Sequence, residues 1–217
     1  MEKRKKVIAI SAHPDDLEIG ASFAVMNYVR EGYEVYSILV TDGDKGGDSA
    51  VRIREAEEAA KVLGIKDIFR LKCPDTNLPK ESKLIEKLES FYYKYLPEVV
   101  ITHTTKERHK DHVQVSNASR IAFRKSSTII MFRSVSGLVE FSPHLFYVGD
   151  KDDLENKIRA CSCHKTQVEK GILDLEVIQA NAIFWGNVYN PYEKKYAEPF
   201  EINHYGMILK KQGGRLI

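Results

Sequence analysis

The stretch "KKVIAISAHPDDLEIG", residues 5–20, decides the fold of this chain. Its apolar, β-branched run "VIAI" predicts a short buried strand that ends near residue 12. His13, Asp15 and Asp16 follow this strand directly. Titratable groups this close together repel one another, or are costly to bury, unless a positive charge lies among them. We therefore expect something positively charged among these side chains.

Apolar runs and amphipathic segments alternate through the first 125 residues. We expect strands over residues 5–12, 34–41, 67–72 and 98–103, and helices over residues 17–32, 50–64, 80–96 and 110–125. The strand segments are apolar throughout rather than at every second position, which is typical of a parallel sheet with helices on both faces.

The remainder of the chain changes in character. Residues 128–135 and 143–149 favour strands, whereas residues 151–170 and 177–187 favour helices. No repeat, low-complexity tract or long linker separates the two parts. We therefore expect an α/β fold in one domain, residues 1–217, with a mostly parallel sheet and a C-terminal extension of that sheet.

Composition and charge limit the function classes. The chain carries 33 Lys and Arg against 31 Asp and Glu, and the resulting net charge of +2 does not favour nucleic acid or an anionic membrane as a partner. No apolar run approaches the roughly 20 residues that span a bilayer, and the run behind the basic N-terminus is too short for a signal peptide. Three cysteines at positions 73, 161 and 163 are typical of a cytoplasmic protein with reduced thiols, and the spacing in "CSCH" is not that of a zinc finger.

Polar clusters follow the first four expected strands. They are residues 13–16, residues 42–44, Asp75 and residues 103–112. Because ligands of open parallel sheets bind outside the carboxyl ends of the strands, we expect these clusters to converge on one edge as an active site.

The cluster "HTTKERHKDH", residues 103–112, supplies imidazoles to that edge. His109 and His112 are three residues apart and share a face if the turn is helical. Either of them, with His13 and an aspartate of the 15–16 pair, completes the three-ligand set of a catalytic zinc with one open position. A water in that position has a pKa near ~7, and the remaining aspartate and histidine can handle protons. Each motif alone is more often a solvated or capped helix start, but their shared edge favours the metal site.

Both segments together resemble a known family. "SAHPDDLEIG" (11–20) and "HKDH" (109–112) are similar to the A-H-P-D-D and H-x-D-H segments of the LmbE-like, or PIG-L, family of zinc-dependent N-acetylglucosamine deacetylases. Further similar stretches run along most of the chain: "TDGDKG" (41–46), "RIREAEEAAKVLG" (52–64), "PDTNL" (74–78), "HKTQ" (164–167) and "YAEPFEI" (196–202). The resemblance implies a Rossmann-like (LmbE-like) fold, which agrees with the alternation above.

The resemblance also implies a role for each site residue. It places one zinc ion per chain, or another divalent metal, on His13, Asp16 and His112. Asp15 is then the general base, and His109 stabilises the oxyanion and acts as the acid.

Three further residues receive roles from the resemblance. Arg52 and Asp44 are expected on the substrate side, with Arg54 close enough to be confused with Arg52, and Asp111 is expected to orient an imidazole. The chain departs from many members at Ser22 and Phe23, where they have two glycines, and at Thr166, where they have serine. The imidazoles at 103, 144 and 204 are expected to be structural, and Trp185 is expected to pack in the core, with sugar stacking as the lesser alternative.

The expected function is the zinc-dependent hydrolysis of an N-acyl group, expected to be N-acetyl, from a soluble N-acetylglucosamine-type substrate or conjugate. The rival is a non-catalytic Rossmann-like module that binds a nucleotide or a structural metal. The first strand is not followed by Gly-x-Gly-x-x-Gly, which argues against nucleotide binding, and the open metal position argues against a structural site. The sequence leaves open the conjugate, the acyl group, the physiological metal and a possible homo-oligomer.

Overall fold

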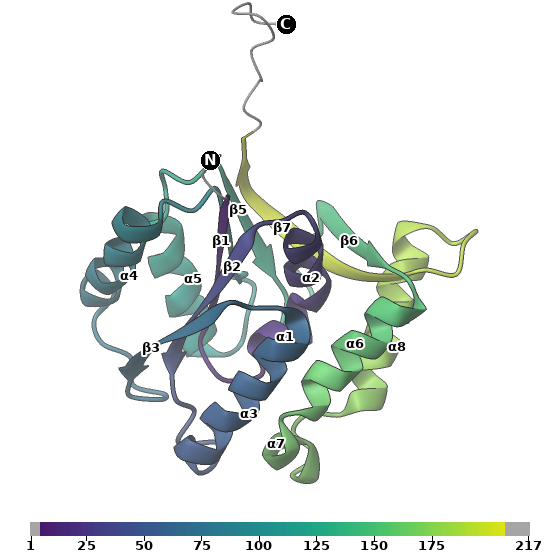
Figure 1. The fold of residues 1–217 in the computed structure, drawn as a ribbon, viewed down its shortest axis with the longest axis horizontal. Helices are drawn as coiled ribbons and strands as arrows, with labels where there is room; N and C mark the ends of the chain where they lie inside the picture. The colour runs from purple at the N-terminus through teal and green to yellow at the C-terminus, as the bar shows by residue number, and fades with distance from the viewer. Residues whose placement is uncertain (1–4, 207–217) are drawn as a thin grey trace, which may run out of the picture.

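The computed structural model describes residues 5–206 and contains one seven-stranded sheet (Figure 1). Along the sheet the strands follow the order β3-β2-β1-β4-β5-β7-β6. They are β1 (Lys6–Ser11), β2 (Glu34–Thr41), β3 (Asp67–Cys73), β4 (Val99–His103), β5 (Thr128–Phe132), β6 (Leu145–Gly149) and β7 (Tyr196–Tyr205). β1 to β5 are parallel, whereas β7 runs antiparallel to both of its neighbours.

Helices cover both faces of the parallel part, as the sequence predicts. The helices are α1 (Asp16–Gly20), α2 (Ser22–Arg30), α3 (Ser49–Leu63), α4 (Glu81–Tyr95), α5 (Lys110–Ala122), α6 (Lys151–Ser162), α7 (Lys165–Glu169) and α8 (Leu175–Tyr189). One apolar core joins the sheet to α2, α3 and α6, and a second joins its other face to α4 and α5 (Figure 1). The expected α/β fold with a mostly parallel sheet and a C-terminal extension is confirmed.

Two expectations about single helices are wrong. The helix expected over 17–32 is two helices, α1 and α2, which are separated at Ala21. The preceding residue, Gly20, lies against the Phe132 ring, and a Cβ at this position would be only 2.3 Å from that ring. The helix expected over 151–170 is broken around the buried His164.

Strand β7 was not expected at all. Its sequence contains Pro199, and proline inside a sheet removes a ladder hydrogen bond. The strand nevertheless lies between β5 and β6, where Pro199 pairs with Phe146. It supplies the antiparallel extension of the sheet.

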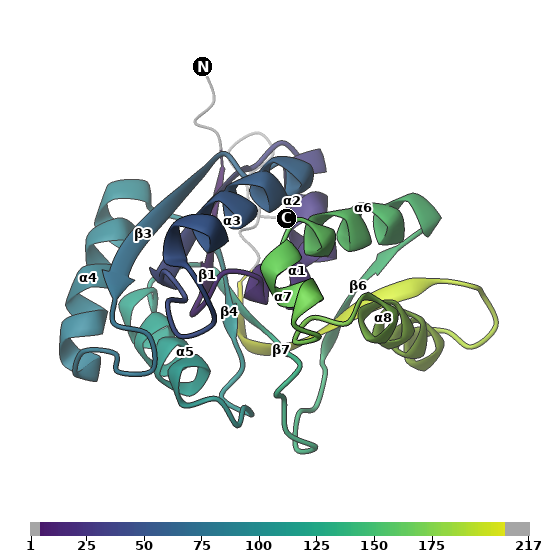
Figure 2. The same ribbon diagram turned by 90° about the horizontal axis from the view of Figure 1, so that it is seen from below.

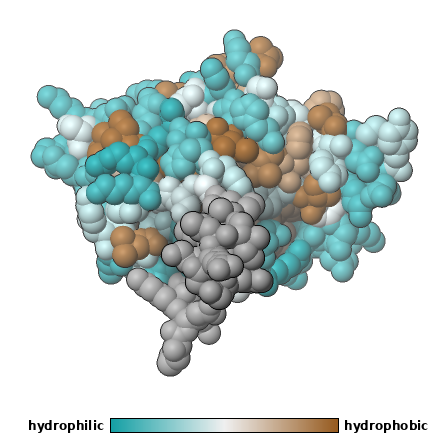
Figure 3. All heavy atoms as spheres, turned by 90° about the horizontal axis from the view of Figure 1, so that it is seen from above, coloured by the Kyte–Doolittle hydropathy of each residue, from teal (hydrophilic) through white to brown (hydrophobic). Residues whose placement is uncertain are grey.

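The carboxyl ends of the parallel strands lie at one side of the molecule, which Figure 2 views directly. The loops after β1, β2, β3 and β4 all lie there. The opposite side, shown in Figure 3, carries mainly hydrophilic side chains with scattered hydrophobic ones among those coloured. Within residues 5–206 no helix has the length and apolar character to cross a membrane.

Candidate metal centre and active site

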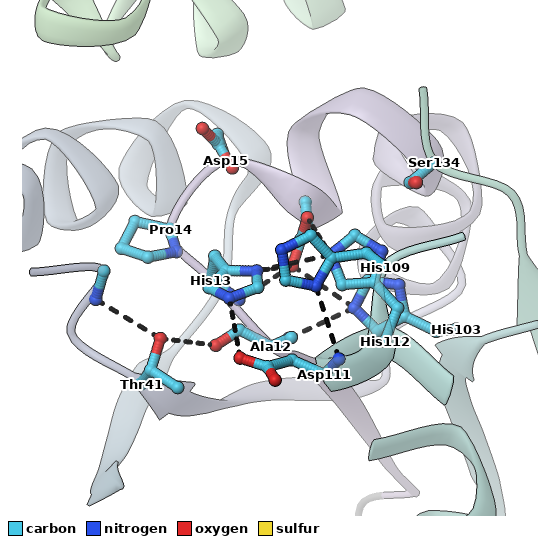
Figure 4. Close-up of polar contacts among 12 residues, drawn as sticks. Ala12, His13, Pro14, Asp15, Thr41, His103, His109, Asp111, His112 and Ser134 are labelled. Atoms are coloured by element: carbon cyan, nitrogen blue, oxygen red, sulfur yellow. Dashed lines mark hydrogen bonds and ion pairs between the residues drawn. The ribbon is translucent and has the colours of Figure 1, made fainter. Parts of the chain in front are cut away.

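Three side chains meet at the end of β1. His13 Nδ1 lies 3.2 Å from His112 Nε2 and 3.6 Å from Asp16 Oδ2, and His112 Nε2 lies 3.3 Å from Asp16 Oδ1 (Figure 4). The turn that brings them together is tight, because the Asp16 carboxylate accepts the His13 backbone N–H at 2.7 Å. Asp15, between them, has φ 100°, in the left-handed region that few non-glycine residues adopt. The predicted ligands His13, Asp16 and His112 are therefore adjacent.

The far nitrogen of each imidazole that is predicted to be a ligand faces a carboxylate. His13 Nε2 lies 3.1 Å from Asp75 Oδ1 and 3.4 Å from Asp111 Oδ2. His112 Nδ1 lies 3.6 Å from Glu107 Oε2. A proton held on the far nitrogen leaves the near nitrogen with its lone pair, which is how carboxylates orient histidine ligands of metals. Asp111 thus contacts an imidazole, as expected, and Asp75 does so more closely.

The charges of the cluster suit a bound cation. Burial alone would lower the pKa of His13, but Asp111, Asp16 and Asp75 outweigh it and raise the pKa of His13 to about 12. Burial also opposes charging of His112, yet Asp16 and Glu107 raise its pKa to about 9. These buried carboxylates create a strong demand for positive charge. Two imidazole nitrogens and one carboxylate that lie within 3.6 Å of one another are a donor set that suits zinc, so the residues fit such an ion. Neighbouring groups that could hold a metal are His13 with His109 and His112, Asp16 with His103 and His112, and His13 with Asp75 and Asp111.

His109 stands beside the three ligands at the N-cap of α5. Its ring stacks on His112 with centroids 4.6 Å apart and meets the His13 ring edge-on at 4.7 Å. Its Nδ1 accepts the Asp111 backbone N–H at 3.3 Å, which assigns the proton of the neutral ring to Nε2. Burial, followed by His112 and His13, lowers the pKa of His109, so the ring is held neutral and can donate through Nε2.

His103 lies closer to the site than the sequence indicates. It is the last residue of β4, is fully buried, and lies 3.2 Å from Asp16 Oδ2 through Nε2, with its ring stacked on His112 at 4.1 Å. The same Nε2 accepts the Ala12 backbone N–H at 3.1 Å, which engages its lone pair. Burial lowers the pKa of His103 to about 4. His103, Asp16 and His112 also form a group that could hold a metal, whereas the sequence predicted only a structural role for His103.

Asp15 points toward Arg52 and away from the imidazoles (Figure 4). Burial raises the pKa of Asp15 to about 7, Asp16 adds to this, and Arg52 opposes it. The Arg52 side chain is only 4% exposed and donates to Asp15 Oδ2 at 3.1 Å and to the carbonyls of Pro14 and Gly43, each at 2.8 Å. The structure thus brings Arg52 to the proposed base.

The other residues expected on the substrate side lie nearer the surface. Arg54 is exposed on the outer side of α3, whereas Arg52 faces inward. Asp44 is exposed in the loop after β2, and the next residue, Lys45, donates its backbone N–H to Asp75 Oδ2 at 3.0 Å. Asp44 is therefore placed beside the site without a contact to its ligands.

Two carboxylates of the site were not given roles from the sequence. Asp75 was placed on the correct edge because it follows β3, and that position was the available signal. Glu107 had no such signal, since it lies in the loop before α5 and its contact with His112 depends on how that loop folds. Asp75 lies far from His13 in the sequence, and Glu107 lies outside the helix that carries His112, so helical spacing predicts neither contact.

Comparison with known proteins agrees with this geometry. The profile of the PIG-L family, described as GlcNAc-PI de-N-acetylase, matches residues 8–123, which include every residue of the cluster. This chain belongs to the PIG-L family. The PIG-L family recognition made from the sequence is therefore confirmed.

Two curated relatives are named deacetylases. The chain is 29% identical over 171 residues to an uncharacterized deacetylase, YaiS, of Escherichia coli, which covers 76% of this chain and 92% of the relative. It is 27% identical over 220 residues to the diacetylchitobiose deacetylase of Thermococcus kodakarensis, covering 89% of this chain and 81% of the relative. The expectation of an amidohydrolase is confirmed at the level of this family.

A solved deacetylase structure also resembles this chain. The N,N'-diacetylchitobiose deacetylase of Pyrococcus horikoshii superposes with a TM-score of 0.74 at 26% identity, covering 93% of this chain and 84% of the other. The LmbE-like fold of the PIG-L family is thereby established for this chain over most of its length.

Proposed function

We propose that this PIG-L family member hydrolyses the N-acetyl group of a soluble N-acetylglucosamine-type substrate or conjugate, with one zinc ion on His13, Asp16 and His112. The observation that carries the proposal is the meeting of His13 Nδ1, His112 Nε2 and the Asp16 carboxylate within 3.6 Å. Names of relatives that act on diacetylchitobiose support the sugar class.

The ion, when bound, supplies a Lewis acid that polarises the amide and lowers the pKa of water. Asp15 accepts the proton of the water whose oxygen bonds to the amide carbon, and its raised pKa, near neutrality, suits a general base. The Asp15 carboxylate faces Arg52 in the structure, so this role requires its side chain to turn toward the imidazoles. His109 donates a hydrogen bond from Nε2 to the oxyanion. The proton that Asp15 accepted passes to the amine that leaves as the C–N bond breaks, which returns Asp15 to its starting state. The products are acetate and a free amino sugar.

Remaining roles belong to the same proposal. Asp111, with Asp75, holds the His13 ring, and Arg52 holds the turn that carries Asp15 by donating to the Pro14 carbonyl. Asp44 is proposed to contact the sugar from the loop after β2, which is joined to the site through Lys45. A cytoplasmic location remains a prediction from cysteine usage; Cys73, Cys161 and Cys163 are all free thiols.

A deacetylation screen tests the proposal. Zinc-reconstituted protein is incubated with N-acetylglucosamine, N,N'-diacetylchitobiose and nucleotide- or thiol-precursor glycosides, and released amine is measured. We expect release from at least one class, and no release by His13→Ala. Absence of release from every class, with tight binding of a nucleotide instead, would favour the non-catalytic module.

A further inference from the structure

Helix α8 is apolar on its outer face as well as on its inner one. Its inner face packs on the protein through Ile178, Ala182 and Gly186. Of its 15 residues only Glu176 is charged, whereas α3 and α4, of the same length, each carry several charges of both signs. A helix that is apolar all round is normally buried on every side. Figure 2 shows α8 at the periphery of the molecule, next to β7, so its outer face calls for cover from outside the chain.

The outer face of α8 carries a seam of four residues. The seam consists of Val177, Asn181, Phe184 and Val188. Its three apolar members are exposed, and Asn181 between them is half-buried. Successive members are four, three and four residues apart, which is the 3.5-residue period by which two helices pack side by side. The spacing therefore indicates that the cover is another helix.

The exposed apolar surface has the size that a stable interface needs. Ile172, Ile183, Tyr189 and Tyr192 flank the seam along the chain and are also exposed. Phe184, Tyr189 and Tyr192, exposed by 56%, 52% and 94%, leave roughly 300–500 Å² uncovered, since a whole aromatic side chain offers about 150–250 Å². A standard interface buries about 800 Å² on each partner, somewhat more than half of it apolar. The surface on and beside α8 is therefore large enough for a stable dimer.

The charges at the two ends of α8 suit a second copy in antiparallel orientation. Asp174 and Glu176, both exposed, stand at its start. The exposed Lys194 follows its end, in a segment where Glu193 and Lys195 pair with each other. Antiparallel packing of two copies places the acidic start of each helix beside the basic end of the other, whereas parallel packing brings like charges together.

We infer that a second copy of this chain packs on α8, with the two helices antiparallel about a two-fold axis. Each contact then occurs twice, as in an isologous dimer. Val177 of each copy faces Val188 of the other, and Asn181 of each copy faces Phe184 of the other. The axis passes between Asn181 and Phe184, and a polar asparagine at such a seam fixes the register of the pair. The inference does not depend on the proposed deacetylation.

The mass of the protein in solution tests the pairing. We expect light scattering on the full-length, zinc-loaded protein to give at least two chains of 24.8 kDa each. Phe184→Glu should halve this mass and raise the dissociation constant of the pair at least about 100-fold, because it places two like charges near the axis in place of a central aromatic anchor. Tyr93→Glu on α4 is the control, since Tyr93 is exposed by 59%, and should keep the wild-type mass.

Two results of this measurement would overturn the inference. One is a wild-type protein that is monomeric at the highest concentration measured. The other is an assembly that Phe184→Glu leaves unchanged, or that Tyr93→Glu disrupts equally, while circular dichroism shows that both variants are folded.

Disulfide cross-linking tests the orientation and does not rely on Phe184→Glu. Positions 177 and 188 lie eleven residues apart on one helix, about 16 Å along its axis, which is too far for a bridge within a chain. Mild oxidation of the double variant Val177→Cys, Val188→Cys should give a covalent dimer. Each single variant and the wild type, with its three native thiols, should give at least about fivefold less. Equal cross-linking of single and double variants, or none in the double variant, would overturn the antiparallel pairing.

Discussion

The Arg52 guanidinium lies 3.1 Å from Asp15 Oδ2, and both side chains are buried, Asp15 in the turn after β1 and Arg52 on α3. Arg52 also donates to the carbonyls of Pro14 and Gly43, so one cation joins the loop after β1 to the loop after β2. This contact distinguishes two arginines that the sequence alone leaves ambiguous.

Replacement of Arg52 should therefore affect both stability and turnover. Arg52→Met leaves the Asp15 carboxylate buried without its cation, and we expect a loss of about 3 kcal/mol in the free energy of unfolding. Turnover should fall as well, because Asp15 loses its positioning partner. Urea unfolding and amine release measure the two effects. Arg54→Met, on the exposed side of α3, is the matched control; equal effects of both substitutions would contradict this assignment.

The carboxylate behind His13 should tune metal affinity. Asp75 accepts from His13 Nε2 at 3.1 Å, and loss of such a partner typically lowers metal affinity about 10–100-fold. Asp75→Asn should lower the zinc affinity of this protein by a similar factor, which competition with a zinc chelator measures. Asp42→Asn serves as control because Asp42 lies after the neighbouring strand but pairs with Arg70. An unchanged zinc affinity in Asp75→Asn would show that Asp75 does not orient the ligand.

His109 should serve the reaction without holding the metal. It lies near His13 and His112, so a ligand role is the alternative. His109→Gln should keep one zinc per chain and lose about 10²–10³-fold in turnover, as expected when an oxyanion donor is removed. Zinc content by atomic absorption and amine release on the same preparation separate the two roles. Loss of zinc would identify His109 as a ligand.

The buried ion pair between Lys157 and Glu198 predicts a pH-dependent stability. Burial raises the pKa of Glu198, and Lys157 counteracts this through their 2.5 Å contact. Lys157→Met should cost about 3–5 kcal/mol at neutral pH, because it leaves a buried carboxylate unpaired. A carboxyl whose pKa is higher in the folded state binds its proton more readily when folded. Its contribution to stability therefore falls as the pH rises.

The loss in free energy of unfolding that Lys157→Met causes relative to wild type should accordingly shrink as the pH falls toward the ordinary glutamate pKa. Unfolding by urea at about pH 5 and about pH 7.5 measures it, both values lying above the ordinary glutamate pKa of about 4.3. Adding Glu198→Gln removes the titrating group and should flatten this dependence. A deficit that is equal at both pH values would contradict the account.

The parallel half of the fold could be predicted from sequence because its strands are short apolar runs bounded by helices. The rule that strand ends share one edge predicted that the loops carrying His13, Asp16 and His112 converge, whereas the choice of these three residues came from the family resemblance. The structure brings their side chains together. Strand β7 could not be predicted, because Pro199 and its charged neighbours obscure the strand pattern.

The rest of the site depends on contacts between distant loops. Glu107 reaches His112 only through the fold of the segment before α5, and the Arg52 contact with Asp15 spans 37 positions. Trp185 is half-buried and its ring packs against Phe141, Phe146 and Phe184, so its packing depends on contacts with other segments as well as on α8 itself. Side-chain contacts of this kind depend on how distant segments pack together, and the local periodicity of the sequence does not predict them.

The two adjacent aspartates test the central claim most directly. Zinc content and amine release from the preferred N-acetylglucosamine conjugate are measured on wild type, Asp15→Asn and Asp16→Ala after the same zinc loading and dialysis. We predict one zinc per chain in wild type and in Asp15→Asn, with turnover of Asp15→Asn lowered about 10²–10⁴-fold, and loss of zinc from Asp16→Ala. Wild-type turnover in Asp15→Asn, or undiminished zinc in Asp16→Ala, would contradict the account.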